Sequence, residues 1–182
     1  MVAEEEGRKI AREPLRPIED GSPISASGPH KPHQNHLLAA LPSSDYERVA
    51  SHLELLPMNL GDVLYESGAH LRYVYFPTTT IISLLYVMED GASAEIAIVG
   101  NEGMLGISLF IGGDTTPSRA VVQSGGHAFR LKADLLKIEL AHFDPTIHLL
   151  LRYTQALITQ MSQTAVCNRH HSLDNSYVDG FY

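Results

Sequence analysis

Short β-rich runs recur through the middle of this sequence and restrict the folds that it can adopt. The runs are rich in β-branched and aromatic residues, and turns that contain glycine separate them. Many short strands at regular intervals favour an antiparallel sandwich or barrel. Asp90-Gly91, between the third run and the fourth, predicts a two-residue hairpin. The runs cover residues 63–65, 74–76, 81–88, 94–99, 120–122 and 128–131.

Helical patterns flank these strands on both sides. Ser44 and Glu47 have the spacing of a capping box, which predicts the beginning of a helix. Pro145 is well suited to a first helical turn, where its missing N–H would have no partner in any case. After Pro145 no Gly or Pro interrupts the chain until Gly180. The predicted helices cover residues 36–41, 45–53, 133–141 and 145–171.

The long last helix carries two rows of apolar residues. The first row is Ile147, Leu150, Thr154, Leu157, Met161 and Thr164, and the second is Leu151, Ile158 and Ala165. Two rows on one helix suggest two partners, the β-rich domain and a second helix. We therefore predict a homodimer through this helix, with Leu150, Leu157 and Met161 at the interface. The alternative is one broad stripe buried in a single core.

The chain divides into four predicted segments. Residues 1–34 hold five of the ten prolines and few large apolar side chains, which predicts a flexible arm. Residues 35–144 form the β-rich domain with its flanking helices, 145–173 the dimerisation helix and 174–182 a short tail. His30, His33 and His36, near the end of the arm, are interpreted as polar linker residues because no thiolate or carboxylate cluster accompanies them.

Charge and composition exclude several classes of partner. With 21 acidic and 13 basic residues the net charge is −8, and no cluster of Lys and Arg suggests a nucleic-acid partner. No apolar run approaches the ~18 residues of a membrane span, so no membrane partner is expected. The charged N-terminus does not resemble a signal peptide, and Cys167 is the single cysteine. The cytoplasm is the predicted compartment.

Three segments carry a resemblance to a known family. Residues 60–68 (LGDVLYESG) resemble the early hairpin of cyclic-nucleotide-binding domains, and Tyr75-Phe76-Pro77 falls where that family has its next strand. Residues 100–110 (GNEGMLGISLF) resemble the segment that leads into its phosphate-binding cassette. The chain is most similar to Crp/Fnr-type transcription regulators, over residues 35–173. The resemblance implies a mainly β fold with α-helices: an antiparallel β-roll (a double-stranded jelly roll) between short N-terminal helices and a long C-terminal helix.

The resemblance also implies a ligand site, which this sequence keeps only in part. Gly106 matches the glycine of the cassette, but Ile107 stands where the family has a glutamate that binds the ribose. Arg119 matches the arginine that pairs with the phosphate, and Ala120 follows where a hydroxyl residue is expected. The candidate ligand-binding residues are Gly106, Ile107, Ser108, Arg119 and Ala120. The lost polar groups predict that cAMP and cGMP are not bound, unless another acid such as Glu102 reaches the site.

The sequence therefore predicts a degenerate sensor or interaction module. It is not expected to bind DNA by itself, because a helix-turn-helix domain would not fit between the long helix and Tyr182. The alternative is the sensing domain, for a nucleotide or another small anion, of a truncated Crp/Fnr-type regulator. The identity of the small ligand stays open.

A metal-dependent enzyme of the cupin type is the competing interpretation. Such a site needs two histidines spaced by one residue on a strand, and neither His70 nor His127 has that partner. Cys167 and His171 share one helical face, but two ligands do not make a structural site. We therefore expect no enzyme activity, no metal and no cofactor.

Overall fold

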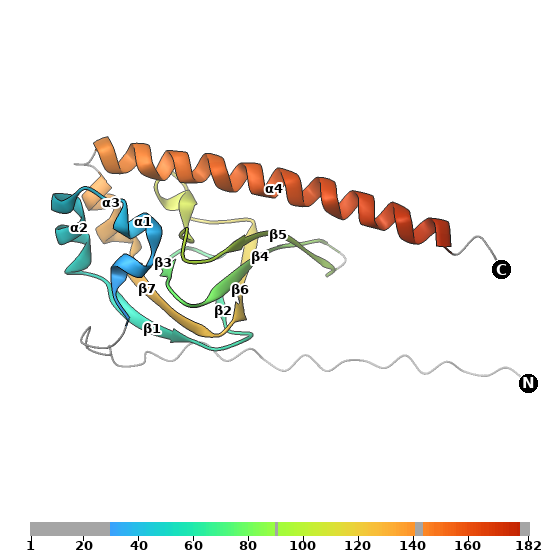
Figure 1. Cartoon of the computed structure of the whole chain (residues 1–182), viewed down its shortest axis with the longest axis horizontal. Coiled ribbons are helices and arrows are strands. Elements are labelled where there is room, and N and C mark those ends of the chain that lie inside the picture. Colours follow the sequence, from blue (N-terminus) through green and yellow to red (C-terminus); the bar gives the residue numbers. More distant parts are fainter. Residues whose placement is uncertain (1–29, 90, 141–143, 179–182) are drawn as a thin grey trace, which may run out of the picture.

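Two antiparallel sheets form the body of the molecule, and the computed structural model describes residues 30–89, 91–140 and 144–178 (Figure 1). Over these residues one sheet has three strands in the order β1-β7-β3, and the other has four in the order β2-β6-β4-β5. The predicted antiparallel β-roll with flanking helices is confirmed. The strands are β1 (Glu54–Met58), β2 (Val63–Tyr65), β3 (Tyr73–Pro77), β4 (Ile81–Val87), β5 (Ser93–Val99), β6 (Ser118–Ser124) and β7 (Gly126–Lys132).

All six predicted runs are strands, but two expectations about the sheets were wrong. The sequence did not predict β1, because Pro57 interrupts its apolar pattern. Proline is tolerated there since β1 is an edge strand and Pro57 points to solvent. The hairpin between β4 and β5 exists, but its loop is longer than two residues. The amide of Met88 donates to the carbonyl of Ala92, and Asp90 lies outside the described residues.

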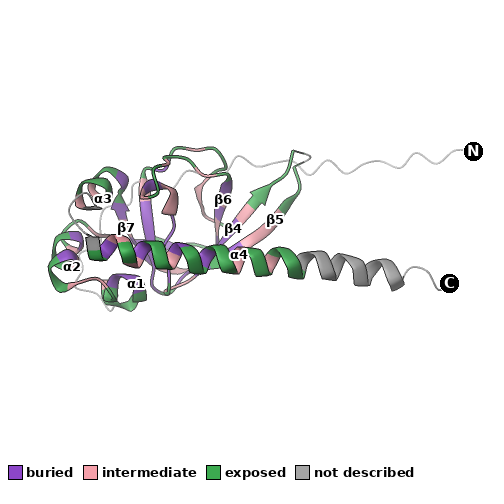
Figure 2. Cartoon of the chain, turned by 90° about the horizontal axis from the view of Figure 1, so that it is seen from above, coloured by how far each residue is buried: buried purple, intermediate pink, exposed green. Residues whose placement is uncertain are grey.

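The helices gather at one end of the roll, and the last one runs across its face (Figures 1 and 2). In the described residues none is long and apolar enough to cross a membrane. The predicted capping box is wrong: the second helix begins at Ser43, and the Ser44 hydroxyl donates to the carboxylate of the next residue, Asp45. The helices are α1 (His36–Ala39), α2 (Ser43–Ala50), α3 (Ala133–Leu140) and α4 (Asp144–Val178), with 3₁₀ turns η1 (Pro32–Gln34) and η2 (Ile107–Leu109).

The boundary of the predicted arm falls inside ordered structure. Most of residues 1–34 lie outside the described part, but η1 and His30 lie against the domain. The His30 ring stacks on His127 of β7 with 3.8 Å between centroids. His33 packs against Tyr46 of α2 at 4.0 Å. These two histidines therefore contact the domain rather than belonging to a linker.

Two apolar clusters fill the interior. One lies between the two sheets and includes Tyr75, Ile82 and Val122. The other lies between the three-stranded sheet and the helices, and includes Leu38 and Phe129. Adjacent residues of one strand serve different clusters because side chains alternate along a strand. The burial of these side chains is the main stabilising contribution to the fold.

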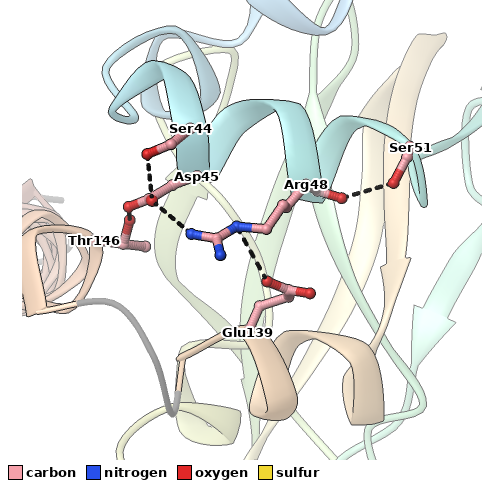
Figure 3. A network of polar contacts seen from close by, with 6 residues as sticks. All are labelled: Ser44, Asp45, Arg48, Ser51, Glu139 and Thr146. Carbon is pink, nitrogen blue, oxygen red and sulfur yellow. Dashed lines mark hydrogen bonds and ion pairs between the residues drawn. The ribbon is translucent and has the colours of Figure 1, made fainter.

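Buried polar contacts fix the helical end. Asn35, which is 0% exposed, donates to the carbonyls of Pro77 and Gly103 at 2.9 and 2.8 Å, and its side-chain oxygen caps α1 by accepting from Leu38. Figure 3 shows a second contact, in which Thr146 of α4 donates to Asp45 of α2 at 2.6 Å. Two segments distant in sequence are thus joined at each contact.

The charge of Asp45 is stabilised by its neighbours. The Thr146 hydroxyl holds the pKa of the Asp45 carboxyl below its usual value, against the opposing effect of burial. Ser44 and Arg48 add contacts at 3.1 and 3.3 Å, and Arg48 also lies 4.0 Å from Glu139 of α3. Helices α2, α3 and α4 therefore meet at one polar network (Figure 3).

The two apolar rows of α4 have different surroundings, as the coloured ribbon of Figure 2 shows. The first row packs on the roll of its own chain, where Leu150 and Leu157 are 3% and 5% exposed and Met161 is half-buried. Side chains buried in this way offer little surface to a second copy. Leu151 and Ile158 of the second row are 46% and 56% exposed. The helix also continues to Val178, beyond its predicted end.

Candidate functional site

A cavity of about 260 Å³ lies between the roll and α4. Helix α4 contributes Leu157 and Met161 to one wall, and η2 with the glycine before it contributes another. Strands β2, β4 and β5 and the segment that enters β6 complete the enclosure. The lining residues are Tyr65, Leu71, Leu84, Ile96, Met104, Leu105, Gly106, Ile107, Ser108, Ile111, Thr116, Pro117, Ser118, Leu157 and Met161.

The first half of the predicted cassette lies where the resemblance implies a ligand site. Gly106 has φ of +96°, and a Cβ there would lie 2.9 Å from a methyl group of Val74, so glycine is required for two reasons. Gly106, Ile107 and Ser108 all line the cavity. The Oγ of Ser108 is buried and has no hydrogen-bond partner.

The second half of the predicted cassette does not reach the cavity. Along β6 the buried side chains are Ser118, Ala120 and Val122, so Arg119 lies on the opposite face of the sheet. Its Nε is buried and lies 3.3 Å from a carboxylate oxygen of Glu66, the residue that follows β2. Ala120 is fully buried in the cluster between the sheets and does not line the cavity. The structure therefore separates Arg119 and Ala120 from Gly106, Ile107 and Ser108.

Three residues that the sequence did not single out take their place. Thr116, Pro117 and Ser118 line the cavity beside Tyr65 of β2. The hydroxyls of Thr116 and Ser118 lie 2.9 Å apart and bond to each other. Burial raises the pKa of the Tyr65 hydroxyl, which keeps it neutral. The alternation of side chains along β6 is the signal that would have placed Ser118, rather than Arg119, at this site.

Among the described residues that line the cavity, none is charged at neutral pH. Its polar members are hydroxyls, and its other residues are mainly aliphatic or Met. Glu102, the acid considered as a substitute, accepts from the amide of Gly100 at 2.9 Å and is not part of the lining. Burial raises the pKa of Tyr153, the α4 residue that donates to the Met104 carbonyl, to about 12. The surroundings therefore suit an uncharged ligand better than an anion.

A second depression, at the open end of the roll, is lined by Tyr73, Tyr75 and Arg130. The Arg130 guanidinium donates to Glu54 at 2.8 Å and lies 4.4 Å from the centre of the Tyr73 ring. Arg130 is thus held by an ion pair and by an aromatic ring of the protein itself. Within the described ranges, no three His, Cys, Asp or Glu side chains are grouped so that they could hold a metal ion.

Comparison with solved structures places the fold in a known class. The sequence matches no protein-family model, and no curated protein matches it significantly. The regulatory subunit of a cAMP-independent protein kinase A from Trypanosoma brucei aligns at 17% identity with a TM-score of 0.58, over 67% of this chain and 44% of that one. This chain thus spans less than half of that subunit.

Bacterial regulators give similar alignments. The c-di-GMP responsive global regulator CLP from Xanthomonas campestris aligns at 14% identity with a TM-score of 0.59, over 69% of this chain and 63% of that one. The N-terminal domain of a transcriptional regulator from Streptomyces coelicolor aligns at 17% identity with a TM-score of 0.54, over 74% and 95%. The chain therefore has the fold of cyclic-nucleotide-binding domains, the fold also found in the sensor domains of Crp/Fnr-type regulators.

Proposed function

We propose that this chain is a cyclic-nucleotide-binding-like regulatory module that does not bind cAMP or cGMP at physiological concentrations. The position of Arg119 carries the proposal: its side chain lies beside Glu66, on the face of the sheet turned away from the cavity, and none of the described residues that line the cavity is a cation. A cyclic phosphate in the cavity would lose its charge-assisted contact, and the ribose would meet Ile107 in place of a carboxylate. These losses together weaken binding by about 100-fold or more. The alternative, anion sensing through Arg119, has less support because its side chain points away.

Calorimetry with cAMP and cGMP tests this proposal. We expect no saturable binding, and a dissociation constant below about 10 µM for either nucleotide would overturn it. Ile107→Glu combined with Ser118→Arg should introduce measurable binding, because both positions line the cavity. Arg119→Ala, added to the Ile107→Glu and Ser118→Arg variant, is the matched control: it should change the introduced nucleotide binding by less than about two-fold, whereas a large loss would place Arg119 in the site after all.

The module is proposed to act by binding rather than by catalysis. The described residues of its cavity supply hydroxyl groups but include no His, Asp, Glu, Lys or Cys that would activate them as nucleophiles. DNA binding by the chain alone is not expected, since the net charge is −8. A gel-shift assay at low salt is the measurement, and tight, sequence-dependent binding would contradict this expectation.

We further propose a homodimer through the second row of α4, defined by Leu151, Ile158 and Ala165. All three are exposed in the single chain, and their spacing suits helix pairing. Leu151→Glu with Ile158→Glu should convert the dimer to a monomer in sedimentation experiments. Thr159→Glu with Gln163→Glu, on a different face of the same helix, is the control and should leave the dimer intact. A wild-type protein that stays monomeric at high concentration would refute the dimer.

A further inference from the structure

The cavity under α4 combines three properties that together define a class of ligand. It is enclosed on one side by Leu157 of α4 and on another by Leu84 of β4, and its lining is mainly apolar. None of the described side chains that line it is charged. One of its lining residues, Ser108, has a buried Oγ with no hydrogen-bond partner.

The size and the lining of the cavity favour a small aromatic or alicyclic molecule. An apolar cavity of roughly 150 Å³ accepts benzene and holds no water. At about 260 Å³, this cavity has room for a molecule larger than benzene but less than twice its size. A charged group would lose its hydration there without a compensating partner, which is unfavourable by several kcal/mol.

The hydroxyl groups differ in what they can offer to such a molecule. Ser118 and Thr116 bond to each other, so their hydroxyls are already partly satisfied. Ser108 alone has an unused buried hydroxyl, and a buried polar atom in this state calls for an explanation. Ser108 lines the cavity, but its Oγ is shielded from the cavity in this structure. A rotation of the side chain about χ1 would expose the Oγ, and a ligand hydroxyl or carbonyl would then supply the missing partner.

We infer that this cavity binds an uncharged, mainly apolar ring compound that carries one hydroxyl or carbonyl group, bonded to Ser108. This inference rests on the proposed regulatory function and names the ligand class of the same site. The ligand would contact η2 of the roll and Met161 of α4 at the same time. Binding therefore stabilises the contact between α4 and the roll.

Three probes of nearly equal shape test the ligand class by calorimetry: naphthalene, β-naphthol and β-naphthalenesulfonate. We expect β-naphthol to bind with a dissociation constant below about 100 µM, and the sulfonate at least about 20-fold more weakly. Ser108→Ala should weaken β-naphthol about five-fold and leave naphthalene within two-fold, because only β-naphthol has a group to bond. Equal binding of the sulfonate, or an unchanged β-naphthol affinity in Ser108→Ala, would overturn the inference.

The location of binding is tested by filling the cavity. Ile96→Trp should abolish β-naphthol binding, and Met161→Trp is a second filling variant in case the first does not fold. Ile98→Trp is the matched control on the same strand, where Ile98 is exposed and outside the cavity, and should leave binding unchanged. Binding that persists in both filled variants would refute the site. Absence of both β-naphthol and cAMP binding refutes this inference alone, whereas micromolar cAMP binding refutes the proposed function.

Discussion

The helical end of the domain and the cavity end use their buried polar atoms differently. At the helical end Asn35 makes three hydrogen bonds, and the carboxylate of Asp45 is satisfied by Thr146, Ser44 and Arg48. At the cavity end Ser108 has an unpartnered hydroxyl beside unfilled space. Unsatisfied polar atoms and cavities both reduce stability. The helical end therefore stabilises the fold, whereas the cavity end is less stable and leaves room for a ligand.

The largest effect on the free energy of unfolding should come from Asn35→Ala, which removes buried hydrogen bonds at the helical end. The change removes a helix cap and leaves the carbonyls of Pro77 and Gly103 without these donors. We expect the free energy of unfolding to fall by about 3 kcal/mol in chemical denaturation. Asn59→Ala, at an exposed turn, should change it by less than about 0.5 kcal/mol. A loss for Asn35→Ala no larger than that of Asn59→Ala would remove the contrast between the two ends.

Asp45→Asn should have the next largest effect on the free energy of unfolding, and this effect should depend on pH. We expect a loss of about 1.5 kcal/mol at neutral pH, because the Thr146 hydroxyl then donates to a neutral group. The folded-state pKa of Asp45 lies below its unfolded value of 3.8, so the carboxylate stabilises the protein above pH 3.8. That contribution disappears as the pH falls through the folded-state pKa.

Unfolding measured from pH 7 down to pH 3 and below checks this sign. The difference between wild type and Asp45→Asn should shrink with acidification. Glu47→Gln, exposed on the same helix, should show a much smaller difference over the same range. If the difference in free energy of unfolding between wild type and Asp45→Asn grows on acidification, the Asp45 carboxylate does not have the proposed stabilising role.

Tyr153→Phe tests the boundary between the two ends. Tyr153 joins α4 to the roll through the Met104 carbonyl at 2.9 Å, and its ring lies against Gly103 so closely that a Cβ there would overlap it. Loss of this hydroxyl should lower the free energy of unfolding by about 1 kcal/mol, as measured by denaturation. The matched change Tyr86→Phe, on a half-exposed residue of β4, should be close to neutral.

Ser108→Ala should have the smallest effect, and in the opposite direction. Removing a buried hydroxyl without a partner should raise the free energy of unfolding by about 0.5 kcal/mol. Ser118→Ala is the control inside the same cavity, and it should destabilise the protein because its hydroxyl is bonded to Thr116. If both changes destabilise equally, Ser108 is not an unsatisfied group and the comparison of the two ends fails.

The local patterns of the sequence predicted most of the fold. Short runs rich in β-branched and aromatic residues placed six strands, and the uninterrupted apolar rows placed α4, because these signals depend only on residues close in sequence. Strand β1 escaped detection since Pro57 is acceptable only at an edge, and edges are set by the order of strands in the sheet. The sequence also did not predict the role of Asn35, because its hydrogen-bond partners, Pro77 and Gly103, are distant in the sequence.

The predicted cassette residues separate into two groups in the structure. The family resemblance matched Gly106, Ile107 and Ser108 to the cassette, and these three residues line the cavity. Arg119 was matched by its residue type, whereas the direction of a side chain on a strand depends on register, and a shift of one residue reverses the face. The sequence also could not predict which row of α4 packs on the roll. Both rows are apolar, and only tertiary packing distinguishes them.

The length of α4 has a mechanical consequence. Among the described side chains of α4, Met161 is the last that packs against the apolar core of the roll, and the helix continues to Val178, projecting beyond the sheets (Figure 1). At 1.5 Å per residue this projecting part is about 25 Å long. A tilt of about 10° around Met161 would displace its tip by roughly 4 Å, which is less than the rise of one helical turn. Met161 thus divides the helix into a packed half and a projecting half of equal length, so a tilt of the packed half over the cavity would displace the tip of the projecting half by a similar distance.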